Sequence, residues 1–156
     1  MRIQVINVAQ KLPAWVDTAC DDYLKRIPRE ISLQFVTVPL ASRKSQQSRA
    51  RLQQQESAHK LEKLPSCSLN IALEEGVESW STADWSKHMQ IWMFYYPLVN
   101  MIICGPYVVT PAFIEVCRHR VSLGKRTMPH ALVKVVLVEQ LYRAWTILKG
   151  HPYHRQ

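Results

Sequence analysis

No apolar run in this chain of 156 residues approaches the roughly 20 residues that a membrane-spanning helix needs. Its first residues, Met1 to Val5, also lack the basic and apolar regions of a signal peptide. Neither an internal repeat nor a linker divides the sequence, and its length is near that of an ordinary domain. We therefore expect one cytoplasmic domain, residues 1–156, without a membrane segment.

The cysteines lack the paired spacing that indicates a zinc site or a disulfide framework. Near the end of the chain, His151 and His154 are of a type that binds metals, but no neighbouring cysteine or aspartate completes a ligand set. We therefore expect no bound metal. The four cysteines are Cys20, Cys67, Cys104 and Cys117.

Acidic residues are few, since 12 Asp and Glu stand against 20 Lys and Arg and leave a net charge of +8. This imbalance favours a polyanionic partner, first a nucleic acid and second an anionic membrane surface. Charge alone does not choose between the two.

Short apolar segments alternate along the chain with longer segments of helical periodicity. Such alternation is typical of an α/β fold with a mostly parallel sheet and helices on both of its faces. Prolines mark several helix starts, because proline fits the first helical position. The predicted strands are residues 3–8, 31–38, 69–73, 98–103 and 120–123, and the predicted helices are residues 13–24, 48 onward, 82–95, 111 onward with Thr110 as its cap, and 129–148.

The final predicted helix carries apolar residues around more of its circumference than the roughly 100° arc that one sheet face covers. A second copy of the chain would bury the remainder, so we expect a homodimer whose interface includes this helix. The alternative is a helix enclosed within its own domain. The apolar residues are Leu132, Val135, Val136, Val138, Leu141, Tyr142, Ala144, Trp145 and Leu148.

Three loops follow predicted strands, at residues 73–76, 104–107 and 124–129. The carboxyl ends of parallel strands lie at one edge of a sheet, and open α/β sheets bind their ligands at that edge. The loops therefore predict a small-molecule site. A single Gly-Pro turn such as Gly105-Pro106 would be weak support, because many strands simply end in such a turn.

The C-terminal segment is dense in aromatic and cationic residues, although a terminus that frays into solvent is usually polar and poor in aromatics. It contains YRAW (residues 142–145) and HPYHR (residues 151–155), preceded by MPHALVK (residues 128–134). Together with KLPAWV (residues 11–16), these motifs resemble the rRNA large-subunit methyltransferase H family of the SPOUT class. The resemblance implies a C-terminal trefoil knot.

The resemblance also implies an activity. Members of this family methylate N3 of a pseudouridine in large-subunit (23S) rRNA on the ribosome, with S-adenosylmethionine as the methyl donor. Carried over by position, the implied cofactor contacts are Leu73, Gly105, Gly124, Lys125, Arg126, Thr127, Met128 and Pro129.

The chain departs from the family pattern in the loop of residues 104–108. Cys104 and Val108 stand where the family has glycine, and a β-branched valine resists the positive φ that glycine permits. A second hypothesis is therefore a non-catalytic ribosome- or RNA-binding protein that has kept the fold while its cofactor loop changed.

Tyr153, His154 and Arg155 supply a stacking ring, a titratable imidazole and a fixed cation in three successive residues. The resemblance suggests that they act in methyl transfer, at the cofactor of the partner subunit. We expect this tail to contribute little to folding. His130 is a candidate acceptor for the N3 proton, and its alternative role at a helix start is a structural hydrogen bond.

Basic residues near the predicted ligand site are the candidates for RNA contact. They would bind phosphates, which makes binding salt-dependent without reading the base sequence. The alternative is an ordinary solvated surface. The residues are Arg118, Arg120, Lys125 and Arg126.

Overall fold

The computed structural model describes residues 1–8, 12–38, 64–65, 67–104 and 110–155. These residues contain a five-stranded sheet in which all paired strands are parallel, in the order β2-β1-β4-β3-β5. The predicted strand ranges are confirmed to within two residues at each end. The strands are β1 (Arg2–Val8), β2 (Ser32–Val38), β3 (Leu69–Leu73), β4 (Leu98–Ile103) and β5 (His119–Val121).

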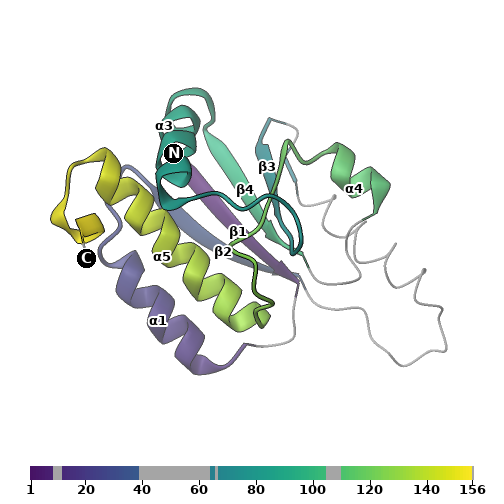
Figure 1. Ribbon diagram of the computed structural model, residues 1–156, viewed down its shortest axis with the longest axis horizontal. Coiled ribbons are helices and arrows are strands. Elements are labelled where there is room, and N and C mark those ends of the chain that lie inside the picture. The colour runs from purple at the N-terminus through teal and green to yellow at the C-terminus, as the bar shows by residue number, and fades with distance from the viewer. Residues whose placement is uncertain (9–11, 39–63, 66, 105–109, 156) are drawn as a thin grey trace.

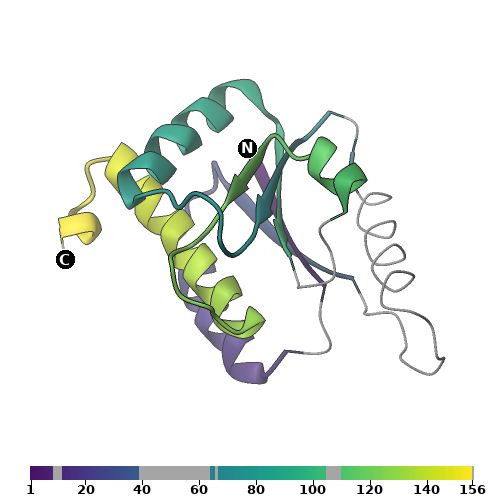
Figure 2. The same cartoon turned by 45° about the vertical axis from the view of Figure 1, so that its right-hand side comes forward.

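Helices cover both faces of the sheet, which confirms the predicted α/β architecture (Figures 1 and 2). Helices α1 (Ala14–Leu24), α3 (Thr82–Tyr95) and α5 (His130–Leu148) pack on one face, and α4 (Pro111–Glu115) packs on the other. Every residue of β3 and β4 is buried between these layers. The helix predicted from residue 48 onward lies outside the described residues. Within the described part of the chain, no helix combines the length and apolar character needed to cross a membrane.

Local sequence determines where the helices begin and end. The Ser81 hydroxyl accepts a hydrogen bond from the Asp84 N–H at 3.2 Å, and the Asp84 carboxylate accepts one from the Ser81 N–H at 3.1 Å, which forms a capping box for α3. As predicted, Thr110 caps α4, because its hydroxyl accepts from the Phe113 N–H at 3.3 Å. Gly150 closes α5 in a left-handed conformation with φ 64°.

Helix α5 lies between α1 and α3 (Figure 1). Leu137 and Leu141 face the sheet core, while Val138 packs with residues of α1. The helices of the same chain therefore cover much of the apolar arc, which is the alternative to a dimer that the sequence left open. Leu132, near the N-terminal end of α5, remains 43% exposed, and Trp15, near the N-terminal end of α1, remains 48% exposed.

An aromatic cluster joins α3 to β5. The ring centroids of Trp80 and His88 lie 3.9 Å apart in a stacked pair, and those of His88 and His119 lie 5.3 Å apart. Burial removes water from both imidazoles, so the pKa of His88 and the pKa of His119 are lowered from the usual value for histidine. The positive charge of Arg118 contributes to the lowered pKa of His119.

These histidines predict that the fold loses stability in mild acid. An unfolded histidine takes up a proton below a pH of about 6.5, whereas the folded rings take it up only at lower pH. The unfolded chain then binds more protons, so the free energy of unfolding should fall as the pH drops from about 7 to about 5. Urea unfolding across this range measures the slope. The double variant His88→Gln, His119→Gln should flatten it, and an unchanged slope would contradict the assignment.

Candidate functional site

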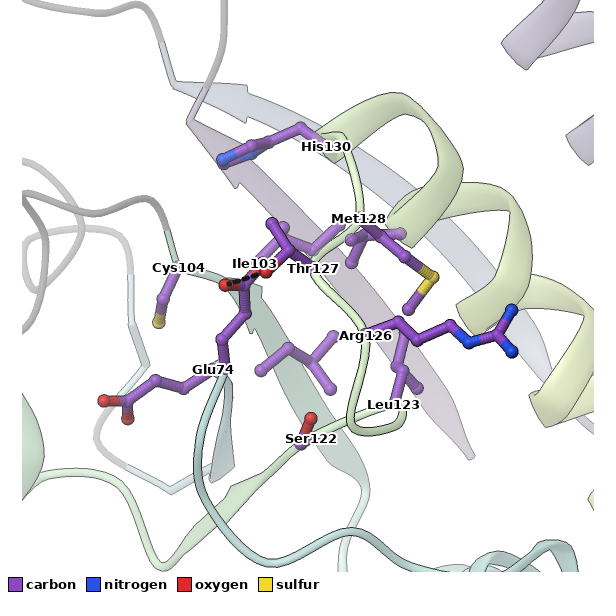
Figure 3. Close-up of a pocket in the computed structure, with 12 residues that line it drawn as sticks. Glu74, Ile103, Cys104, Ser122, Leu123, Arg126, Thr127, Met128 and His130 are labelled. Atoms are coloured by element: carbon purple, nitrogen blue, oxygen red, sulfur yellow. Dashed lines mark hydrogen bonds between the residues drawn. The ribbon is translucent and has the colours of Figure 1, made fainter.

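A cavity of about 570 Å³ opens at the carboxyl edge of the sheet. Its walls come from the ends of β3 and β4, the segment after β5 and the start of α5 (Figure 3). Both its size and its position are typical of ligand sites in open α/β sheets. Of the three loops predicted to meet at this edge, the loops after β3 and β5 are found there. The loop after β4 contributes Cys104, and residues 105–109 lie outside the described residues.

Backbone hydrogen bonds hold the strand ends together at the cavity. The Cys104 N–H donates to the Leu73 carbonyl oxygen, and the Glu74 N–H donates to the Val121 carbonyl oxygen, both at 3.0 Å. These bonds follow from the parallel register, which places Leu73 beside Ile103 of β4 and beside Val121 of β5. The sheet therefore assembles the cavity from segments that are far apart in the sequence.

The cavity combines apolar walls with a polar rim. Such a lining suits a ligand that has a flat apolar part and polar or charged ends. Within the described residues, no group of three His, Cys, Asp or Glu side chains is arranged to hold a metal ion. The lining residues are Leu73, Ile103, Leu123, Met128 and Val133, which are apolar, Cys104, and the polar or charged Glu74, Glu75, Ser122, Arg126, Thr127 and His130.

The structure brings part of the sequence-predicted site to this cavity. Of the implied cofactor residues, Leu73, Arg126, Thr127 and Met128 line it, and so does the candidate base His130. Three more, Gly124, Lys125 and Pro129, lie in the same loop as residues 126–128 but do not line the cavity. The remaining one, Gly105, lies outside the described residues.

Sequence reasoning did not single out several of the lining side chains. Their common signal is position, because each lies at a strand end, just after one, or on the first turn of α5. The residues missed in this way are Ile103, Ser122, Leu123 and Val133.

Side chains fix the loop that follows β5. Ser122 Oγ donates to the Gly124 carbonyl oxygen at 2.6 Å and accepts from the Gly124 N–H at 3.3 Å. Gly124 has a φ of 151°, a conformation that favours glycine. The Thr127 hydroxyl donates to Glu75 Oε2 at 3.2 Å and so ties this loop to the loop after β3 (Figure 3).

Arg120 forms a bidentate ion pair with Glu74. Its Nε and Nη2 each lie 2.9 Å from a carboxylate oxygen, and this pairing raises the pKa of the Arg120 guanidinium. Arg120 therefore fastens β5 to the loop after β3. Arg118 and Lys125 are exposed, and the exposed Arg126 directs its guanidinium away from Glu74 (Figure 3).

His130 is the first residue of α5, and its Nδ1 lies 3.4 Å from Oδ1 of Asn7 on β1. Asn7 is buried. The contact fits the structural role predicted for His130, while its place in the cavity lining fits the catalytic role. The two are compatible, because the tautomer that donates from Nδ1 is also the one whose Nε2 can accept a proton.

The C-terminal tail folds back on α5 as the short helix η1 (Pro152–Arg155). The Tyr153 hydroxyl donates to Glu139 Oε1 at 3.2 Å, and its ring meets the Tyr142 ring edge-on at a centroid distance of 4.8 Å. Burial, aided by the Glu139 carboxylate, raises the pKa of Tyr153 to about 12. Contrary to the expectation for the tail, these contacts predict that Tyr153 contributes to folding, and a sequence pattern does not show that α5 offers it a partner.

The tail follows the C-terminal end of α5 (Figure 1), whereas the cavity is lined by His130 and Val133 at the N-terminal end of this helix. This helix has 19 residues, and at about 1.5 Å per residue it is about 28 Å long. A single chain therefore keeps Tyr153 and His154 apart from its own His130. The predicted catalytic residues do not form one cluster within the chain.

Comparison with known proteins shows what the chain is similar to. Residues 1–154 match a family described as predicted SPOUT methyltransferase. The chain is 41% identical over 160 residues to a ribosomal RNA large subunit methyltransferase H from Thioalkalivibrio sulfidiphilus, which covers 100% of both proteins. Proteins of the same name from Hahella chejuensis and Pseudomonas putida are 40% and 37% identical, over 100% and 99% of this chain and 100% of each relative.

Proposed function

The chain belongs to the ribosomal RNA large subunit methyltransferase H family, whose members are SPOUT methyltransferases, and this membership implies methylation of ribosomal RNA. We propose that the chain methylates N3 of a pseudouridine in 23S rRNA on the ribosome and that S-adenosylmethionine is the donor. The observation that carries this proposal is the cavity at the carboxyl edge of the sheet.

The side chains of the cavity fit this donor. Leu73, Ile103 and Met128 offer apolar contact for the adenine ring, and the loop of residues 124–129 offers backbone groups. Carboxylates on the rim suit a ligand that carries positive charge. When bound, the donor supplies a methyl group on a cationic sulfur.

The chain must also position the base and receive its proton. Alignment of N3 with the methyl group supplies much of the rate enhancement in such a transfer. His130 at the cavity is the proposed proton acceptor. Arg118, Lys125 and Arg126 are the proposed phosphate contacts, and Arg120 supports them from its ion pair with Glu74.

We propose that the active unit is a homodimer in which the tail of one subunit acts at the cavity of the other. Two observations support this. The tail lies at the wrong end of α5 to serve its own cavity, and the exposed Trp15 and Leu132 are apolar surface available for a partner. Tyr153, His154 and Arg155 would then contact the base or stabilise charge that develops on it.

Three further features belong to this proposal. They are the trefoil knot that the resemblance implies, a single domain over residues 1–156, and a cytoplasmic location, where ribosomes are found. No metal is part of the mechanism proposed.

The test combines binding with product analysis. Calorimetric titration should show one S-adenosylmethionine bound per chain. Ribosomes from a strain that lacks this protein, incubated with protein and donor, should gain methylpseudouridine in 23S rRNA, as mass spectrometry of nucleosides would detect.

Ribosomes that carry uridine at the target position are the matched control, and they should gain no methyl group. If the chain binds neither S-adenosylmethionine nor its demethylated product, and yet binds ribosomes, the non-catalytic hypothesis is the better one. The altered loop that includes Cys104 would then be its physical explanation.

A further inference from the structure

Glu75 contributes a carboxylate to the cavity lining. The neighbouring Glu74 is neutralised by its bidentate pair with Arg120. Glu75 takes part in no ion pair within the described part of the chain, and its carboxylate accepts a hydrogen bond from the hydroxyl of Thr127 at 3.2 Å. A hydroxyl orients a carboxylate without cancelling its charge.

The contact with Thr127 holds this charge at the cavity. Glu75 lies in the loop after β3, and Thr127 lies in the loop after β5, so the bond spans the two loops that form the site. Arg126 is the one Lys or Arg among the lining residues, and its guanidinium points away from Glu74 and Cys104 (Figure 3). Glu75 therefore presents to the cavity, beside its apolar walls, a carboxylate that no ion pair within the described residues neutralises.

We propose that Glu75 is the counter-charge for a cationic ligand and makes the cavity bind the sulfonium donor more tightly than the neutral thioether product. This inference rests on the proposed function and adds a charge criterion to it. A carboxylate near a cation at a protein surface attracts it measurably, although solvent screens the interaction. Because Glu75 is exposed, we expect a preference of about tenfold for the sulfonium form.

The same charge would assist product release. In the transfer, the bond between sulfur and the methyl carbon breaks, a bond between N3 and that carbon forms, and the N3 proton passes to a base. The sulfur becomes neutral as it keeps the bonding electron pair. The product then carries no positive charge on sulfur for Glu75 to attract, so the product dissociates more readily than the donor.

The variant Glu75→Gln tests this inference. Glutamine has nearly the same shape, and its side-chain carbonyl can still accept the Thr127 hydrogen bond, so chiefly the charge is removed. Calorimetry would compare S-adenosylmethionine, S-adenosylhomocysteine and sinefungin, which carries an amine in place of the methylated sulfur. We expect the variant to bind the two cationic ligands about tenfold more weakly and the neutral thioether within about twofold of the unmodified chain.

Glu78→Gln is the matched control, because Glu78 is exposed, lies three positions further along and is not a lining residue. It should change none of the three affinities by more than about twofold. Raising the salt from about 0.05 M to about 0.5 M should reduce the preference of the unmodified chain for the sulfonium form, while the Glu75→Gln variant responds less.

The outcomes separate the two proposals. If the unmodified chain binds all three ligands and Glu75→Gln weakens them equally, or changes none, the inference about Glu75 is wrong and the proposed function stands. If the unmodified chain binds none of them, the proposed cofactor is wrong, and the inference falls with it.

Discussion

Removal of residues 153–156 is expected to abolish methylation of ribosomes, with a loss of at least about 100-fold, the scale seen when a group that stabilises developing charge is deleted. The physical reason is that Tyr153, His154 and Arg155 provide aromatic, titratable and cationic groups that the lining of the cavity supplies only in part. Mass spectrometry of rRNA nucleosides measures the loss. Full methylation by the shortened chain would remove the tail from the mechanism.

The shortened chain should also be less stable. Tyr153 donates a hydrogen bond to the Glu139 carboxylate and packs against Tyr142, and loss of both contacts should cost about 2 kcal/mol. The variant Tyr153→Phe keeps the ring and loses only the hydroxyl, so it isolates the hydrogen bond. His154→Ala should retain stability and lose activity. Urea unfolding separates these effects from the catalytic ones.

Replacing Thr127 by tryptophan should block the cavity. Thr127 is exposed and lines the site, so the bulky ring occupies space that the ligand needs while the core remains intact. We expect S-adenosylmethionine to bind at least about tenfold more weakly, which corresponds to about 1.4 kcal/mol. Calorimetry measures this loss, and the midpoint of urea unfolding should stay unchanged.

Thr127→Ser is the matched control, because serine keeps the hydroxyl that donates to Glu75. It should bind the donor with nearly normal affinity. Normal binding by the tryptophan variant would show that the ligand site lies elsewhere.

The two defective chains can be combined to ask which subunit supplies the tail. A mixed dimer of the tail-deleted chain and the Thr127→Trp chain contains one intact cavity and one intact tail, located on different subunits. If the tail acts across the dimer, mixing the two inactive proteins should restore activity. If it acts on its own cavity, or if the chain stays monomeric, the mixture should remain inactive.

The sequence predicted the strands well where apolar runs are continuous and bounded by loop residues. Both β3 and β4 match the predicted ranges, because each is buried on both sides and nearly every residue is apolar. The short strand β5 ends two residues before its predicted end. Just after this end, the Ser122 hydroxyl forms hydrogen bonds with the backbone of Gly124, and the apolar pattern of the sequence does not predict such bonds.

The sequence predicted where the site lies, but it did not predict which side chains contact one another there. Parallel strands put their following loops at one edge, so the alternation of elements was enough to locate the cavity. The pair of Glu74 with Arg120 depends on β3 lying beside β5, which only the register of the sheet decides. The partner of Tyr153 similarly depends on the path of the chain after Gly150.

The arrangement of β1 has a consequence for how the chain folds during synthesis. Arg2 of β1 pairs with Ser32 on one side and with Leu98 on the other, and α5, which covers the core, is made after all five strands. During synthesis, β1 therefore lacks its second neighbouring strand, β4, until more than half of the chain has been made. Pairings so distant in sequence form slowly. We expect the chain to acquire its native structure after α5 has emerged, rather than segment by segment.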